Sequence, residues 1–194
     1  NPFDQLLGQV IAAGPVVLAH AGVDEAPDGQ PPLPDASITG TLPANVADWP
    51  AELAAIPELD DVAIGHGLIN FRPDSDGVIR SAPLVMRAGG KPRPAFGAEI
   101  ARNMVGADSI AVSPDSVRIG GSNVPVDPEG RMRLHFGRFP SDKIVSAALV
   151  LANSKLVAPD QFAGKTVIIG LSAEGTSGVV ATPISVMEVG RLVQ

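Results

Sequence analysis

The chain has 194 residues, with 21 acidic and 14 basic side chains that give a formal net charge of −7. Nucleic-acid binders need a surplus of Lys and Arg to displace counterions from phosphates, so this deficit argues against nucleic acid as a partner. The chain contains no cysteine, which excludes disulfides, thiolate metal sites and cysteine nucleophiles.

The first residues predict a helix followed by a buried strand. Apolar side chains recur at helical spacing from Phe3 to Ile11, which predicts an amphipathic helix over residues 4–13 that ends at Gly14-Pro15. Residues 16–19 form a continuous apolar run, typical of a strand covered on both faces. This order favours an α/β domain. The most apolar stretch, Val10 to Val23, is interrupted by Gly14, Pro15 and His20 and is too short to predict a transmembrane helix, and no signal peptide is evident.

Residues 24–50 differ in composition from the flanking segments. Their many Pro, Asp and Gly residues predict a long Pro-rich loop or insertion. A short helix is expected next, with Asp48 as its cap, Pro50 in its first turn and Pro57 at its end.

Two alternating segments follow, over residues 61–71 and 78–87. The turn-forming residues 73–77 between them predict a β-hairpin. Residues 95–105 predict a helix that ends at Gly106.

The rest of the chain predicts more strands and one more helix. Tight turns separate three short strands, expected over residues 116–119, 123–126 and 131–136. A helix is expected over 144–152, and a buried strand of the parallel type over 165–170. The predicted fold class is α/β, with a mixed, largely parallel central sheet flanked by helices, an inserted hairpin with antiparallel strands, and the Pro-rich loop.

Polar side chains gather on the predicted hairpin, where they suggest contact with a small ligand. The candidate binding residues there are His66, Asn70, Arg72, Asp74, Asp76 and Arg80. The alternative is a solvated face with one Arg–Asp pair and a turn in which Asp side chains bond backbone N–H groups. The Asp-rich turn lacks the later acidic ligand of a calcium loop, and no His–His or paired-acid spacing predicts metal binding or acid–base catalysis.

The glycine-rich loop after Ile169 contributes two further candidates, Ser172 and Thr176. A loop at the carboxyl end of a buried strand suits ligand recognition, and it also suits a hydrolase or transferase. The loop matches neither a nucleophile elbow nor a Walker motif.

Several of these segments, in this order, resemble the CHASE sensor domains of the second class (cyclase/histidine kinase-associated sensory extracellular). The resemblance begins with Gly67-Leu-Ile-Asn70, Asp74-Ser-Asp-Gly-Val-Ile-Arg80 and Pro83-Leu84. It continues through Val124-Pro-Val-Asp127, Phe162-Ala-Gly-Lys-Thr-Val-Ile-Ile-Gly170 and Thr182-Pro183. Gly178 departs from it, because such domains commonly carry an Asp there.

The resemblance implies a single extracytoplasmic sensor domain over residues 1–194, trimmed at both ends, with no catalytic residue, metal or cofactor. Its expected signal is an unknown small molecule or a change in the envelope. A homodimer is expected, and so are transmembrane helices and a cytoplasmic adenylate cyclase, histidine kinase or Ser/Thr kinase elsewhere in the parent protein. A structural envelope domain is the remaining alternative.

Overall fold

In the computed structural model the chain divides into two compact units, and each is described by itself. The described residues are 2–30, 33–137, 143–152, 155–158, 160–170, 181–184, 186–188 and 191–193. The first unit consists of Asn1–Pro73 and Ser81–Leu134, and the second of Asp74–Arg80 and His135–Gln194.

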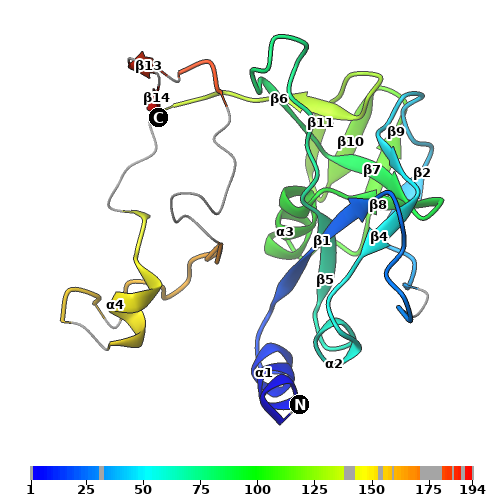
Figure 1. The fold of residues 1–194 in the computed structure, drawn as a ribbon. Coiled ribbons are helices and arrows are strands. Elements are labelled where there is room, and N and C mark those ends of the chain that lie inside the picture. Colours follow the sequence, from blue (N-terminus) through cyan, green and yellow to red (C-terminus); the bar gives the residue numbers. More distant parts are fainter. Residues whose placement is uncertain are drawn as a thin grey trace. The chain divides into compact units, whose positions relative to one another are not determined.

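The first unit is built from short strands and a few helices (Figure 1). Its helices are α1 (Pro2–Ala12), α2 (Pro57–Asp60) and α3 (Phe96–Met104). Its strands are β1 (Val17–Val23), β2 (Ile38–Gly40), β3 (Asp48–Trp49), β4 (Ala51–Leu53), β5 (Gly65–Leu68), β6 (Ser81–Pro83), β7 (Val85–Ala88), β8 (Lys91–Pro94), β9 (Ile110–Ser113), β10 (Ser116–Ile119), β11 (Ser122–Pro125) and β12 (Arg131–Arg133). The second unit has α4 (Ala147–Leu151), β13 (Val186–Glu188) and β14 (Arg191–Val193).

Strand β1 is central to the site described below. It pairs in parallel with β5 and antiparallel with β4, in the order β4-β1-β5. The other sheets of the first unit have the orders β11-β10-β9-β2, β3-β7-β8 and β12-β6. The α/β class with mixed sheets is confirmed, but antiparallel ladders outnumber parallel ones among the described strands, so the predicted largely parallel sheet is wrong.

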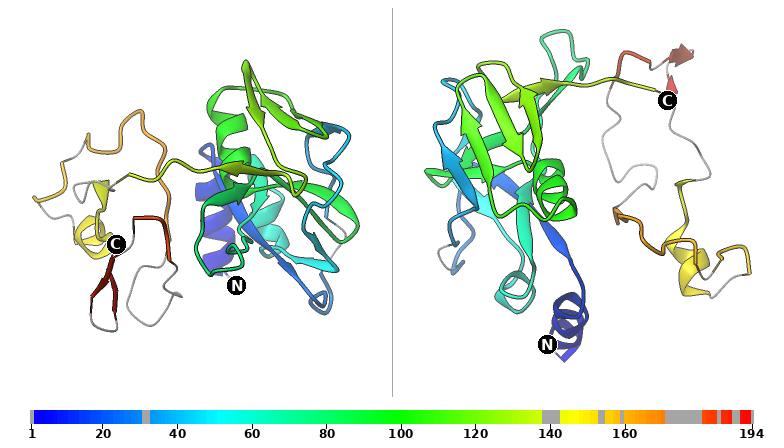
Figure 2. Two further views of the ribbon diagram at one scale, coloured as in Figure 1. Left: turned by 90° about the horizontal axis from the view of Figure 1, so that it is seen from above. Right: turned by 180° about the vertical axis from the view of Figure 1, so that it is seen from behind.

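Helix α3 packs against β1 and β5 (Figure 2). Two glycines in β5 allow this close approach. A Cβ added at Gly67 would lie 2.5 Å from the Cα of Phe96, and one at Gly65 would collide with the carboxylate of Glu99. The core of the unit lies among β5, β7, β9, β10 and α3. Its largest fully buried side chains include Leu68, Met86, Ile110, Val85 and Val117.

The helices with clear apolar periodicity are confirmed. The expected helix over 4–13 is α1, that over 95–105 is α3, and that over 144–152 is represented by α4. Gly106 follows α3 with a φ of +63°, a conformation that glycine adopts at little cost. The strand expected over 16–19 extends further, as β1.

The predicted hairpin of residues 61–71 with 78–87 is wrong. Strand β5 pairs with β1, while β7 forms a hairpin with β8 across Gly89-Gly90. Both glycines have positive φ, as a two-residue turn of type I′ requires. Alternation of apolar and polar side chains predicts that a segment is a strand, but it does not predict which strand will pair with it. The expected hairpin of β10 and β11 is present. Strand β12 was also expected beside them, but it pairs with β6.

The helix expected over residues 48–57 is also wrong. Strands β3 and β4 occupy this segment, and β3 pairs with β7. Pro57 begins α2 instead of ending a helix, because a proline in the first helical turn loses no hydrogen bond.

The buried strand expected over 165–170 is absent from the structure. These residues have no ladder partner among the described residues, and Ile168 and Ile169 are 71% and 92% exposed. An apolar run forms a strand only where a neighbouring strand makes hydrogen bonds with its backbone N–H and C=O groups. No helix within the described residues is long and apolar enough to span a membrane.

Candidate functional site

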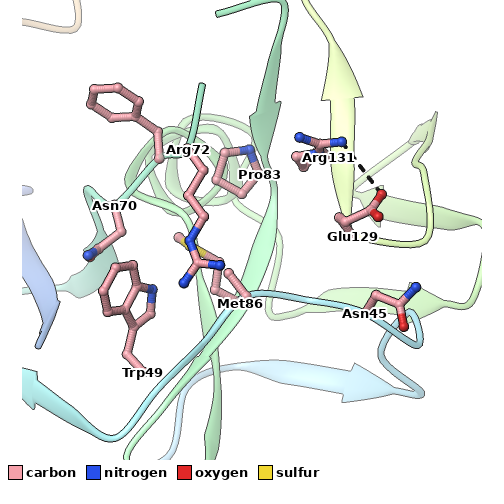
Figure 3. Close-up of a pocket in the computed structure, with 10 residues that line it drawn as sticks. Asn45, Trp49, Asn70, Arg72, Pro83, Met86, Glu129 and Arg131 are labelled. Atoms are coloured by element: carbon pink, nitrogen blue, oxygen red, sulfur yellow. Dashed lines mark ion pairs between the residues drawn. The ribbon is translucent and has the colours of Figure 1, made fainter. Parts of the chain in front are cut away.

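A cavity of about 90 Å³ in the first unit is the principal candidate site, and we call it the Trp49 pocket (Figure 3). Strand β3 contributes Trp49, the segment after β5 contributes Asn70, Phe71 and Arg72, and β7 contributes Met86. Glu129 and Arg131 line its opposite side, where Arg131 pairs with Glu129 at 3.5 Å and with Asp127 at 2.9 Å.

The Trp49 indole lies on a glycine of β1. A Cβ added at Gly22 would come within 2.8 Å of the Cβ of Trp49 and closer still to its ring, so only glycine leaves room there. The Nε1 atom of Trp49 is buried and has no hydrogen-bond partner among the described residues. A buried donor without a partner carries a free-energy penalty that a bound acceptor would remove.

Arg72 lies over the Trp49 ring, with its Cζ atom 5.1 Å from the ring centroid. In Figure 3 the nitrogen-bearing edge of the indole is on the side nearer this guanidinium. A guanidinium within about 6 Å of an indole centroid makes a cation–π interaction. The cation and the indole N–H therefore offer positive charge and a donor within one partly apolar pocket.

Asn70 holds the neighbouring backbone in place. Its Oδ1 accepts from the N–H of Gly22 at 2.6 Å, and its Nδ2 donates to the carbonyl of Gly22 at 2.9 Å. Both hydrogen bonds extend the pairing of β1 beyond the end of β5. Asn70 thus fixes the strand on which Trp49 rests.

A second cavity of about 170 Å³ lies beside a group of buried charges in the same unit. We call this group the His20 cluster: His20, Glu52, Asp60, His66 and Arg93. The Nδ1 atom of His20 lies 2.8 Å from Glu52 Oε1, and its Nε2 lies 2.7 Å from Asp60 Oδ1. Arg93 donates through Nε to the other oxygen of Glu52. His66 Nε2 lies 3.0 Å from the Asp60 carbonyl oxygen and 3.3 Å from Asp60 Oδ1.

The cluster shifts the titration of its members. Burial of the ring disfavours protonated His20, but the hydrogen bonds to Glu52 and Asp60 outweigh burial and raise its pKa. Burial also opposes ionisation of Glu52, yet His20 and Arg93 together lower the pKa of that carboxyl. The contacts within the cluster thus favour the protonated form of His20 and the ionised form of Glu52.

The predicted site residues fall in different places. Asn70 and Arg72 line the Trp49 pocket, whereas His66 belongs to the His20 cluster, so these three side chains do not form one surface, although alternation along a single strand would place them on the same face. Strand β5 ends at Leu68, before that period reaches Asn70. Ser172 and Thr176 lie outside the described residues.

Asp74, Asp76 and Arg80 form a compact turn within the second unit. Arg80 donates to Asp74 at 3.0 Å and to Asp76 at 2.8 Å, while Asp76 accepts from the N–H of Val78 at 3.1 Å. These contacts raise the pKa of Arg80 and, with the backbone hydrogen bond, lower that of Asp76 to about 2. The contacts expected by the alternative, an Arg–Asp pair and an Asp bonded to a backbone N–H, are present in this turn, but Arg80 meets two Asp side chains where one pair was expected.

Sequence reasoning missed Trp49, His20, Glu52, Asp60 and Arg93 as site residues. One signal was present: His20 is the single polar side chain in the apolar run from Val16 to Val23. A polar group inside a buried strand requires a partner. Nothing in the spacing identified those partners.

Comparison with known families gives one match. The model of the CHASE2 domain family matches residues 1–193. No curated protein and no solved structure matches the chain.

Proposed function

Because this chain belongs to the CHASE2 domain family, whose members are sensory extracellular domains of signalling receptors, we propose that it is the extracytoplasmic input module of a bacterial membrane receptor. The family is sensory and not catalytic. The enzyme alternative also loses its structural premise, since no strand precedes the loop after Ile169 within the described residues.

The proposed receptor couples this module through transmembrane helices to a cytoplasmic adenylate cyclase, histidine kinase or Ser/Thr kinase. A signal would act by binding one of two arrangements of the module more tightly than the other. The adjoining membrane helices would then carry the difference to the output domain.

The indole N–H of Trp49, which is buried and has no hydrogen-bond partner in the described part of the chain, is the observation that supports small-molecule binding. Arg72 adds a positive charge over the same ring, while Met86 and Phe71 add apolar surface. A pocket with an apolar wall and two convergent donors suits a small amphipathic molecule with an acceptor or carboxylate group. We therefore propose small organic acids as the ligand class.

Intrinsic fluorescence tests this proposal directly. Trp49 is the single tryptophan and the chain has no tyrosine, so emission excited at a tryptophan wavelength reports on the pocket alone. Titration with acetate, butyrate and benzoate is expected to give a saturable change for at least one acid, with benzamide binding at least about tenfold more weakly because it lacks the charge that Arg72 meets.

The variant Arg72→Ala is expected to weaken that binding by about tenfold or more, the loss of one charge-assisted contact. Arg118→Ala is the matched control, because Arg118 is an exposed arginine on β10 that lines neither cavity. Equal affinity in Arg72→Ala and the wild type, or no saturable change with any acid, would contradict the proposed ligand class. The second result would favour a structural envelope domain.

A homodimer is part of the proposal. Helix α1 carries exposed apolar side chains at helical spacing: Phe3, Leu6, Leu7 and Val10 are between 48% and 75% exposed. Such a face suits burial against a second copy. Sedimentation should show a dimer for the wild type and Gln5→Glu but a monomer for Leu6→Glu, and dimerisation of Leu6→Glu would exclude this face.

A further inference from the structure

The His20 cluster carries a second inference, independent of the Trp49 pocket. We propose that His20, Asp60 and His66 bind a transition-metal dication such as Zn²⁺, with Glu52 orienting His20. The three ligand residues come from β1, from the last residue of α2 and from β5. No spacing in the sequence predicts the site, because the fold alone brings these positions together.

The pairing of β1 with β5 places the two histidines side by side. The parallel register sets His20 opposite Leu68 and Leu18 opposite His66, so the histidines are two positions apart on adjacent strands. Side chains two positions apart share a face of a sheet. Their ring centroids are accordingly 4.7 Å apart, and both Nε2 atoms face the same oxygen of Asp60.

The distances fit a common metal ion. The three ligand atoms lie within 4.8 Å of one another, with Asp60 Oδ1 at 2.7 Å from His20 Nε2 and 3.3 Å from His66 Nε2. With metal–ligand bonds of about 2.0–2.1 Å, ligand atoms around one ion lie roughly 3.0–3.4 Å apart. The His20–Asp60 pair at 2.7 Å has to move slightly apart, and any separation approaching 4.8 Å has to shorten. His66 is the more exposed of the two rings, at 22% against 2% for His20.

Glu52 supplies the outer contact that a metal-bound histidine needs. A ligating imidazole usually donates its other N–H to a carboxylate, which fixes its tautomer and orientation. His20 Nδ1 faces Glu52 Oε1 at 2.8 Å, and Arg93 in turn holds Glu52. With its proton held on Nδ1 by Glu52, His20 presents the Nε2 lone pair to the ion. Any proton that Nε2 carries in the metal-free protein is released to solvent when the ion binds.

The donor set selects the class of ion. Two imidazole nitrogens and one carboxylate suit Zn²⁺, Fe²⁺, Mn²⁺ or Co²⁺, whereas Mg²⁺ and Ca²⁺ prefer sites made of oxygen ligands. The cavity of about 170 Å³ is lined by both histidines and Glu52. It provides room for water molecules to complete the coordination shell and a route by which the ion enters.

Metal titration of the tag-free 194-residue chain, stripped with EDTA, tests the proposal. Calorimetry with ZnSO₄ and CoCl₂ should show one equivalent bound and a rise in Tm, while MgCl₂ and CaCl₂ should leave both unchanged. Cobalt should also give visible absorption bands. If the stripped protein binds neither Zn²⁺ nor Co²⁺ in stoichiometric amount, the proposal is wrong.

Three variants locate the ion. His66→Ala, which alters the most exposed ligand, should lower Zn²⁺ affinity at least as much as Glu52→Ala, for which loss of the outer contact predicts about 10–100-fold. His135→Ala is the matched control, since His135 is an exposed histidine of the second unit. Circular dichroism confirms that each variant is folded. Undiminished binding by folded His66→Ala, or loss of binding in His135→Ala, would overturn the assignment.

Discussion

Two groups of ionised side chains show how burial changes the same chemistry. In the turn of the second unit, Arg80 meets Asp74 and Asp76 with side chains between 28% and 54% exposed. In the His20 cluster, Glu52 meets His20 and Arg93 with side chains no more than 8% exposed. The contact distances are similar, but the surroundings are not.

This difference in burial determines which of the two groups contributes more to the stability of the fold. Exposed ion pairs contribute little, because water and salt screen them and the side chains lose entropy. Buried charges lose their hydration, so each depends on its partners. The cluster should therefore be sensitive to the loss of one member, whereas the turn should not.

The largest expected effect is that of Glu52→Ala. This change leaves His20 and Arg93 buried without their shared carboxylate, and removing one partner of a buried pair destabilises a protein by about 3–5 kcal/mol. The free energy of unfolding measured in urea should fall by that amount. Glu58→Ala is the control, because Glu58 is exposed on the neighbouring helix α2 and its loss should cost less than about 0.5 kcal/mol. Similar losses in both variants would show that burial does not separate the two groups of charges.

The same contrast explains what the sequence predicted. Asp74, Asp76 and Arg80 lie within seven residues, so their pairing follows from local spacing. The members of the His20 cluster come from four strands and a helix, and their meeting depends on the parallel pairing of β1 with β5. That pairing was itself mispredicted, because alternation identified β5 as a strand without naming its partner.

The Trp49 pocket lies between these extremes. Asn70 and Arg72 were predicted from the polar pattern after β5, but Trp49 was assigned to a helix start from the Asp-Trp-Pro sequence. The helices α1 and α3 were predicted because apolar periodicity depends on the segment itself. Strand partners, and sites made from several strands, depend on tertiary packing that no local pattern contains.

A smaller effect is expected from Gly22→Ala, which tests whether the Trp49 pocket responds to a change in β1. The new methyl group overlaps the Trp49 ring, so the indole must move. Overpacking of this kind costs about 1–3 kcal/mol, and the emission of Trp49 should shift. Gly97→Ala is the control: apart from its chain neighbours and the backbone of α3, no described atom lies within 4 Å of a Cβ there, and alanine in α3 should stabilise by about 0.5–1 kcal/mol. Unchanged emission in Gly22→Ala would show that Trp49 does not rest on β1.

The smallest expected effect concerns the exposed turn and its response to pH. Arg80 and the N–H of Val78 lower the pKa of Asp76 from 3.8 to about 2. A carboxyl whose pKa is lowered by folding stabilises the protein above its unfolded pKa, and this contribution disappears as the pH falls through the folded value. The contribution of Asp76 to stability should therefore be complete above about pH 4 and lost towards pH 2.

NMR titration of the carboxyl carbon should follow Asp76 directly, and Arg80→Ala should return its pKa towards 3.8. A pKa of 3.8 or higher in the wild type would mean that the ion pair does not persist in water. The exposed turn would then differ from the buried His20 cluster in kind, because its ion pairs would not persist, whereas those of the cluster would.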